Sequence, residues 1–262
     1  MNAKKLFPLY LILLFLALLI MFLLGRSIHQ NSKKRDFSDI QEEGVLRVVT
    51  EYNSVDYYVS GDSILGLQYE LCKSIEKYSG IAVEIYLENN MDACIQGLEE
   101  CKFDVIARNI PVTNANKQLF AFTIPISKNK QVLIQRKADF NNGISPIRNQ
   151  IDLAKKTLYI PQNSPSKLRI HNLSEEIADT IYVKEIQDYS SEQLLYMVAF
   201  EEIDYAVVDN EIAIKNKDNF PQIDFETDIS FTQFQAWALR KTSPILLDSL
   251  NVWISKYKEN QN

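Results

Sequence analysis

The apolar positions after residue 44 predict an alternation of strands and helices. Leu67, Leu71 and Ile75, followed by Tyr78, are spaced at i, i+4, i+8 and i+11, which places them on one face of a helix. The order strand, helix, strand, helix, strand is predicted over Val45–Thr50, a helix that ends at Gly80, Ile81–Leu87, a helix through Met91 and Leu98, and Phe103–Ala107. Because the connections are short, this order favours a parallel sheet covered by helices.

A second series of the same kind follows the turn-rich segment Asn141–Gln150. Its elements are predicted at Thr157–Ile160, near Ser164–Ile177, at Ile181–Val183, at Ser191–Glu202 and at Tyr205–Val208, before a last helix lined by Leu247, Leu250, Ile254 and Tyr257. Gln131–Gln135 and Phe234–Arg240 are predicted to cross between the two halves. The fold class is therefore α/β, with two lobes joined by a hinge of two crossing strands. Residues 44–135 and 231–262 are assigned to lobe 1 and residues 136–230 to lobe 2, which leaves a cleft where ligands prefer to bind.

The chain begins with an apolar run that predicts a membrane anchor. Leu6–Leu24 holds 19 residues without a charge, close to the ~20 that cross a bilayer. Lys4 and Lys5 precede it and no small-residue cleavage site follows it, so one uncleaved N-terminal transmembrane helix, a signal anchor, is predicted. Residues 1–35 are assigned to this anchor and its basic flank, and residues 36–43 to a polar linker.

The charge of the chain is unevenly distributed. The net charge is −6, but residues 1–35 carry six basic residues and no acid. The rest of the chain therefore carries −12. A domain this acidic repels a phosphate backbone, so nucleic acid is not expected as a partner.

Few residues suit catalysis, metal binding or a phosphate site. Two histidines, His29 and His171, are too few for a zinc site or a Ser-His-Asp triad. The three cysteines are predicted to be small buried apolar groups, and no glycine after Gly143 could build a phosphate cradle in lobe 2. Adjacent acidic pairs are expected at element boundaries or on solvated helix faces: Glu42/Glu43, Glu99/Glu100 and Glu201/Glu202. No cofactor, no metal and no enzymatic activity are expected.

Polar residues beside the predicted strands and helices are the candidates for ligand binding. Ligands of open α/β sheets sit at the carboxyl ends of strands, and tyrosines offer a ring face and a hydroxyl. The candidate set is Tyr52, Tyr57, Arg108, Asn109, Thr113, Asn163, Ser164, Asp209 and Asn210.

Several of these candidates have an equally simple structural explanation. Arg108 could recruit an acidic ligand group or form a salt bridge to a neighbouring carboxylate. Tyr52 and Tyr57 could pack at the rim of the cleft. Asn163 and Ser164 could direct helix N–H groups at an anionic ligand or simply cap that helix. An Asp at position 209 could pair with an amine or cap the next helix.

Four segments together resemble a known family. They are GVLRVVT at Gly44–Thr50, GLQYELCKSIEKYSGIAVEIY at Gly66–Tyr86, FDVIARNIPVTNANKQLFAFTIPI from Phe103, and IDYAVVDN at Ile203–Asn210. Their order and spacing resemble the extracellular solute-binding proteins of the amino-acid-binding type, in particular the non-catalytic amino-terminal domain of membrane-bound lytic transglycosylase F. The resemblance implies a two-lobed periplasmic-binding-protein-like (type II) fold whose hinge closes on an amino acid, a peptide or a muropeptide-like fragment. It also implies that Asp209 receives a ligand amine.

The resemblance decides the predicted topology of the anchor. Four basic residues follow the apolar run and two precede it, so the positive-inside rule by itself would place the large domain in the cytoplasm. A solute-binding fold implies instead a single-pass anchor in the inner (cytoplasmic) membrane, with the soluble domain in the periplasm. The second arrangement is the one expected here.

Two departures from the family pattern leave the function open. Asn116 occupies the position of the usual ligand-carboxylate Arg, and an amide cannot form the same bidentate ion pair. The chain also ends at Asn262, before the closing helix and the lytic domain of that relative. One interpretation is a membrane-anchored solute-binding or sensing module. The other is a catalytically empty relative of the transglycosylase that regulates or binds a partner such as a transporter or a cell-wall enzyme.

Overall fold

The computed structural model describes residues 14–16, 21 and 35–260. Most of the predicted membrane span, Leu6–Leu24, and its basic flank to Lys34 lie outside the described residues. Within the described ranges, no helix is long and apolar enough to cross a membrane. The residues from Arg35 onward belong to one compact unit, and this unit contains both predicted lobes.

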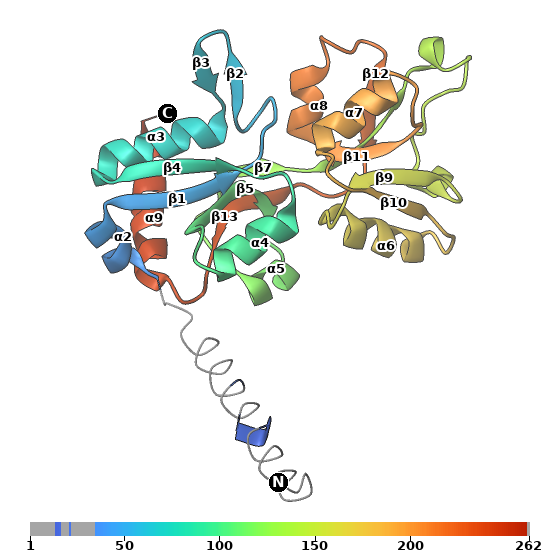
Figure 1. The fold of residues 1–262 in the computed structure, drawn as a ribbon. Helices are drawn as coiled ribbons and strands as arrows, with labels where there is room; N and C mark the ends of the chain where they lie inside the picture. The colour runs from blue at the N-terminus through green and yellow to red at the C-terminus, as the bar shows by residue number, and fades with distance from the viewer. Residues whose placement is uncertain (1–13, 17–20, 22–34, 261–262) are drawn as a thin grey trace, which may run out of the picture. The chain divides into compact units, whose positions relative to one another are not determined.

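A mixed sheet forms the centre of the first lobe (Figure 1). Its strands lie in the order β4 (Ala82–Leu87), β1 (Val45–Thr50), β5 (Val105–Pro111), β13 (Gln233–Leu239) and β6 (Ala121–Phe122), with β7 (Ser127–Asn129) also paired to β13. The pairs β1–β4 and β1–β5 are parallel, which confirms the predicted β-α-β-α-β order. Strand β13 runs antiparallel to β5 because it belongs to the returning chain.

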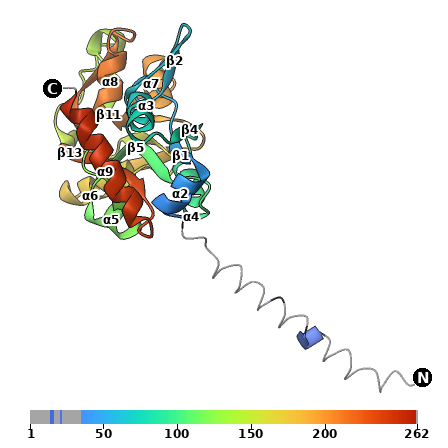
Figure 2. The same ribbon diagram turned by 90° about the vertical axis from the view of Figure 1, so that its left-hand side faces the viewer.

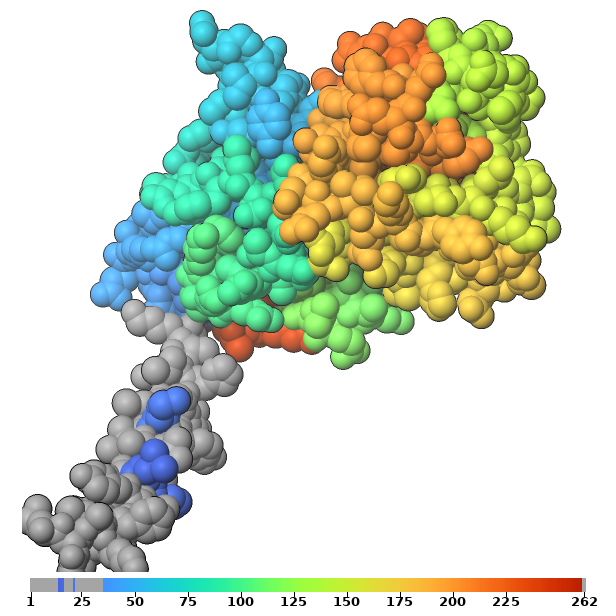
Figure 3. All heavy atoms as spheres, turned by 45° about the vertical axis from the view of Figure 1, so that its right-hand side comes forward, coloured from blue at the N-terminus to red at the C-terminus, as the bar shows by residue number. Residues whose placement is uncertain are grey.

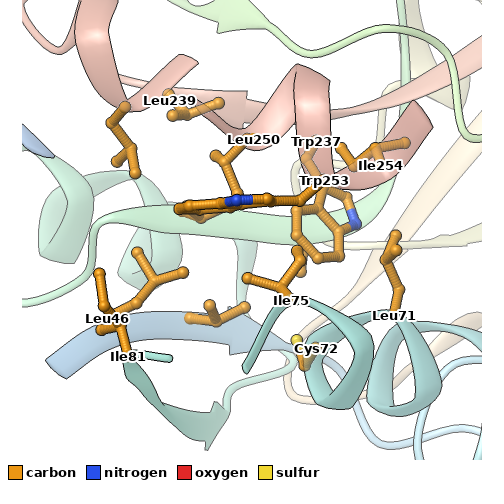
Figure 4. Close-up of a cluster of buried hydrophobic side chains, with 14 of the residues drawn as sticks. Leu46, Leu71, Cys72, Ile75, Ile81, Trp237, Leu239, Leu250, Trp253 and Ile254 are labelled. Carbon is orange, nitrogen blue, oxygen red and sulfur yellow. The ribbon is translucent and has the colours of Figure 1, made fainter. Parts of the chain in front are cut away.

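Helices cover both faces of this sheet. One face packs against α2 (Phe37–Glu43), α3 (Leu67–Ser79) and α9 (Pro244–Glu259), in a core around the fully buried Trp237 (Figures 2 and 4). The other face packs against α4 (Met91–Glu99). Helix α5 (Asn114–Leu119) follows β5, and Phe120 directly after α5 joins the same core. The neighbouring residues Val48 and Val49 enter opposite cores, as the two-residue period of a strand requires.

The second lobe repeats this architecture. Its sheet has the order β10 (Tyr182–Ile186), β9 (Thr157–Pro161), β11 (Ala206–Asp209), β8 (Gln131–Arg136) and β12 (Ile223–Asp228). Strands β10, β9 and β11 are parallel, as predicted. Strand β8 is antiparallel to β11, and the edge strand β12 is antiparallel to β8. One face packs against α7 (Ser191–Ala199) and α8 (Asn210–Asn216), and the other against α6 (Ser166–Glu176). Two 3-10 turns, Ala138–Phe140 and Gln150–Leu153, connect β8 to β9.

The first crossing between the lobes lies earlier than expected. Gln131–Gln135 was assigned to lobe 1, but β8 pairs with β11 and β12 in the second sheet. The chain therefore crosses at Lys130, directly after β7, and returns through residues 229–232 between β12 and β13. A short apolar strand is buried equally well in either sheet, so its composition does not reveal to which sheet it belongs.

The segment 36–43, expected as a linker, is instead the helix α2. Asp36 and Asp39 form a capping box at its start, and Gly44 ends it in the left-handed conformation with φ 77°. The Asp36 carboxylate also accepts the N–H groups of Ile245 and Leu246 at 3.2 and 2.8 Å, so it joins α2 to the start of α9. The sequence of residues 36–43 did not predict a helix because Ile40 is the single buried residue of α2, so no apolar periodicity is present.

A small hairpin lies between β1 and α3, beside the cleft. It consists of β2 (Tyr58–Ser60) and β3 (Ser63–Leu65), paired antiparallel. Gly66 ends it with φ 124°, where an added Cβ would lie 2.3 Å from the backbone oxygen of Asp56. Only glycine allows this approach between the hairpin and the start of α3.

Truncation of Ile40 tests whether α2 is part of the core. Ile40→Ala removes a fully buried side chain from the cluster that contains Trp253 and Leu246, so we expect a loss of about 2–5 kcal/mol in the free energy of unfolding. Val252→Ala is the control, because Val252 on α9 is exposed and its truncation should cost no more than about 0.5 kcal/mol. Urea denaturation measures both. Equal effects would mean that residues 36–43 do behave as a linker.

Candidate functional site

A cavity of about 70 Å³ lies between the two lobes. From lobe 1 it is lined by residues just after β1 and in the second half of β5, and from lobe 2 by residues at or after the ends of β9 and β11. Among them are Glu51, Arg108, Asn109, Ser164 and Asp209. The carboxyl ends of parallel strands thus meet here, as the position rule for ligands predicts. The volume accommodates roughly five to seven water molecules, which suits a small ligand.

Arg108 forms a salt bridge inside this cavity. Its guanidinium pairs with the Glu51 carboxylate, and its Nη1 donates to the backbone oxygen of Asn89 at 3.1 Å. Burial lowers the pKa of Arg108 to about 10, while the negative charge of Asp209 opposes this change. Arg108 therefore remains charged at neutral pH, and the salt bridge considered from the sequence is present.

A buried amide fixes the position of Glu51. Asn53 is fully buried, and its Nδ2 donates to Glu51 at 2.6 Å and to Asp56 at 2.8 Å. Its Oδ1 accepts the N–H groups of Val55 and Asp56 at 2.9 and 2.7 Å. All the polar atoms of the Asn53 side chain are bonded, so this loop holds Glu51 against Arg108 in one geometry.

The same loop is bonded to the core of lobe 1. Gln68 on α3 donates to Asp56 at 3.0 Å and accepts the indole N–H of Trp237 at 2.6 Å. Asp56 is buried, and the pKa of its carboxyl is raised mainly by burial, with a further contribution from the negative charge of Glu192. Sequence reasoning did not select Glu51, Asn53, Asp56 or Gln68. Glu51 directly follows β1, so the position rule that selected Arg108 would also have found it.

Asn109 connects this network to the second lobe. Its Nδ2 lies 3.3 Å from Asp56 and 3.5 Å from Glu211 on α8, and its Oδ1 lies 3.5 Å from Gln68 and from Ser127. Burial and the charge of Asp56 raise the pKa of Glu211. Asn109 thus separates two acidic groups that belong to different lobes.

Asp209 presents a carboxylate to the cavity without a hydrogen-bond partner among the described residues. It stands at the N-cap position of α8, but its side chain accepts no N–H of that helix. Burial, with the charges of Asp56 and Glu211, raises the pKa of Asp209 to about 7, although Arg108 acts in the opposite direction. The capping role considered from the sequence is therefore absent. Asn210 directs its backbone N–H to the oxygen of Lys130 at 2.9 Å and does not line the cavity.

The start of α6 uses its own polar atoms. The hydroxyl of Ser164 accepts the N–H of Ser166 at 3.3 Å, and the backbone oxygen of Ser164 accepts the N–H of Lys167 at 3.1 Å. Asn163, at φ 57°, donates its backbone N–H to Glu185 at 2.9 Å, and its side chain donates to Asp92 on α4 across the lobes. These N–H groups therefore donate to neighbouring atoms of the protein and do not form an open anion site.

A larger groove of about 790 Å³ adjoins the cavity between α5 and α6. Thr113, Asn163 and Ser164 line it. The hydroxyl of Thr113 accepts the N–H of Asn116 at 3.1 Å, and the Asn116 side chain donates to the oxygen of Pro111 at 2.8 Å. The residue at the usual ligand-Arg position is therefore turned back onto its own loop.

The two candidate tyrosines lie outside the lining of the cavity. Tyr52 is 48% exposed, and its backbone N–H donates to the Asn89 side-chain oxygen at 3.3 Å. Tyr57 packs edge-on against Tyr69 at a centroid distance of 5.7 Å. Packing of these two tyrosines at the rim of the cleft stays a prediction.

Direct hydrogen bonds close the lobes near the hairpin. The N–H of Ser54 donates to Glu192 on α7 at 3.1 Å, and Asn216 on α8 donates to the Ser54 hydroxyl at 3.1 Å and to Glu192 at 2.7 Å. The ammonium of Lys215 lies 5.3 Å from the centre of the Tyr58 ring. In Figure 3 the hairpin stands above this junction, and the surface is hollowed between it and α8.

The comparison with known families identifies the domain. The family model of the bacterial extracellular solute-binding proteins, family 3, matches residues 46–262. The chain belongs to this family. Membership in an extracellular family supports a location of this solute-binding domain in the periplasm or outside the cell.

The predicted resemblance to lytic transglycosylase F is also confirmed. The chain is 28% identical over 221 residues to the membrane-bound lytic murein transglycosylase F of Desulfosudis oleivorans, covering 84% of this chain and 47% of that protein. It is 28% identical over 224 residues to the protein of the same name from Aeromonas salmonicida, covering 86% of this chain and 43% of that protein. The chain thus spans less than half the length of these relatives.

Solved structures of amino-acid-binding proteins share the fold. An ancestral arginine-binding protein bound to arginine superposes with a TM-score of 0.71 at 22% identity, covering 83% of this chain and 94% of that one. A substrate-binding protein of an amino acid ABC transporter from Streptococcus pneumoniae, bound to L-arginine, gives a TM-score of 0.72 at 20% identity, covering 86% and 93%. These likenesses confirm the two-lobed architecture of this solute-binding domain.

The raised pKa of Asp209 predicts that stability falls as pH rises. An unfolded Asp loses its proton near pH 4, whereas folded Asp209 keeps its proton up to about pH 7. Between these values the folded state binds more protons, so the free energy of unfolding decreases with increasing pH. After allowance for partial screening by solvent, we expect a loss of about 1–3 kcal/mol between pH 5 and pH 8.

Asp209→Asn should make the free energy of unfolding depend less on pH between pH 5 and pH 8, as measured by urea denaturation across that range. Some slope should remain, because the pKa values of Asp56 and Glu211 are raised in the same direction. Asp218→Asn, at an exposed position on lobe 2, is the control and should keep the wild-type slope. An unchanged slope in Asp209→Asn would contradict the assignment.

Proposed function

We propose that this chain is a membrane-anchored solute-binding or sensing module that closes its two lobes on a small amine-bearing ligand. The observation that carries the proposal is the Asp209 carboxylate, which faces the interlobe cavity with no hydrogen-bond partner among the described residues. Asp209 is half-buried, and its carboxylate form is stabilised when a cation reaches it. A ligand ammonium would supply that cation, opposite the polar wall of Glu51, Arg108 and Asn109.

Several small ligand classes are consistent with this arrangement. Two of the structural neighbours are bound to arginine, which supports an amino acid or one of its derivatives. A peptide or a cell-wall fragment would place its terminal amine in the cavity and extend into the adjoining groove, since Pro111, Gln131, Ser164 and Pro165 line both spaces.

Binding rather than catalysis is the proposed activity. The relatives are named as transglycosylases, and glycan cleavage of that kind needs a positioned acid in a substrate groove. Of the acidic groups in the cleft, Glu51 is paired with Arg108, and Asp56 accepts from Asn53 and Gln68. Asp209 is the group proposed to meet the ligand cation. This pattern supports recognition of a charged ligand.

The anchor remains part of the proposal. Residues 6–24 are apolar and uncharged, and such a run would tether the solute-binding domain to the periplasmic face of the inner membrane. The full chain should stay in the membrane fraction after carbonate extraction, and deletion of residues 1–34 should release it. Release of the full chain by carbonate would contradict the anchor.

A regulatory role is the alternative. The cavity is small, and its Arg108 is already paired with Glu51, so the cleft is partly filled by its own side chains. A chain of this kind could bind a transporter or a cell-wall enzyme through its surface and respond to no solute.

Calorimetry of the full chain in mild detergent decides between these roles. Amino acids, dipeptides and muropeptide fragments are added in turn, and a ligand at 100 times its Kd should stabilise the folded state by about 2.7 kcal/mol. Asp209→Ala should abolish the increase in Tm, and Asp218→Ala, at an exposed site, should keep it. No increase with any solute would favour the regulatory alternative.

A further inference from the structure

Three groups that could hold a ligand carboxylate form hydrogen bonds or ion pairs within the protein. Asn116, at the position of the usual Arg, donates to Pro111. The guanidinium of Arg108 is paired with Glu51 and the Asn89 carbonyl. The first N–H groups of α6, at Ser166 and Lys167, are bonded to Ser164.

Carboxylates outnumber cationic groups in the lining of the cavity. The lining of the cavity contains the carboxylates of Glu51 and Asp209 and the guanidinium of Arg108. Asp56 and Glu211 lie close enough to affect Asp209 electrostatically. Since Arg108 is paired with Glu51, the net charge that faces the cavity is negative once Asp209 is ionised, which happens above about pH 7 or when a cation lowers its pKa.

The remaining walls of the cavity are suited to a hydrocarbon chain. Beside the polar residues Asn89, Gln131, Gln162 and Ser191, the lining contains six apolar residues from both lobes: Met91, Ile110, Pro111, Pro161, Pro165 and Val208. An alkyl segment next to an ammonium group would bury its carbon atoms against them, while the nitrogen lies at Asp209.

We infer that this cavity selects a cationic amine without a free carboxylate, such as a decarboxylated amino acid or an amino-acid amide, over the corresponding zwitterion. The inference rests on the proposed function and specifies the ligand class of the same site. The carboxylate of a zwitterion would enter a space that offers negative charge, and the one cation among the described residues that line that space, Arg108, is already paired with Glu51. Removal of that carboxylate removes the repulsion and leaves the ammonium contact intact.

Matched ligand pairs test the inference by isothermal titration calorimetry on the full chain. The pairs are agmatine with L-arginine and L-alaninamide with L-alanine, because the members of each pair share the amine-bearing skeleton and differ in the carboxylate. We expect the member without the carboxylate to bind at least tenfold more tightly in each pair. Asp209→Asn should weaken agmatine binding at least tenfold, and the exposed control Asp218→Asn should leave it unchanged.

A second variant tests the cause of the preference. Glu51→Gln removes the partner charge of Arg108, so the guanidinium becomes available to a ligand carboxylate. This variant should reduce the preference for agmatine over arginine at least fivefold or reverse it. If it fails to fold, the wild-type comparison still decides.

The outcomes separate this inference from the proposed function. Equal or tighter binding of arginine and alanine by the wild type would overturn the selection against carboxylates and leave the solute-binding role in place. Absence of binding for both members of both pairs, together with no response to other solutes, would overturn the inference and the proposed function together.

Discussion

The ion pair between Arg108 and Glu51 is the interaction on which the cleft depends. Strands β1 and β5 are parallel neighbours, with Val49 beside Ile106, so residue 51 and residue 108 emerge at the same edge of the sheet. A buried guanidinium without its partner would cost several kcal/mol, about 3–5 in comparable cases. Because Glu51 supplies that partner, the cation is neutralised within lobe 1, and the negative charge of Asp209 in lobe 2 is left for a ligand.

The rest of lobe 1 acts as a fixed support for this pair. Trp237 in the core bonds Gln68, Gln68 bonds Asp56, and Asn53 joins Asp56 to Glu51. Lobe 2 meets lobe 1 through Glu192 and Asn216 at Ser54, through Glu211 near Asn109 and through Asn163 at Asp92. Hinge closure requires a site that is half formed on one lobe and then covered by the other. The charges around the cavity decide which ligand favours the closed state.

The periodicity of apolar residues predicted the two parallel sheets because buried strands and amphipathic helices impose distinct spacings. It also placed Arg108, Asn109 and Asp209 near one cavity, since residues at the ends of parallel strands meet at one edge. The sequence could not predict the network of Asn53, Asp56 and Gln68. Its hydrogen bonds join a loop, a helix and the distant Trp237, and such contacts produce no periodic pattern in the sequence. Helix α2 was missed because Ile40 is its single buried residue, and the assignment of β8 depended on pairing partners more than 70 residues away.

The titration of Asp209 tests the central claim most directly. With Asp carboxyl carbons labelled with ¹³C, and the Asp209 signal assigned by its loss in Asp209→Asn, NMR reports the protonation of this group as pH changes. We predict a pKa of about 7 for Asp209 without ligand and a marked decrease when agmatine is bound, because an ammonium favours the carboxylate form. Two results would contradict the claim that Asp209 lacks a cationic partner until a ligand binds. One is a pKa near the ordinary value of about 4 without ligand, and the other is an unchanged pKa on addition of agmatine.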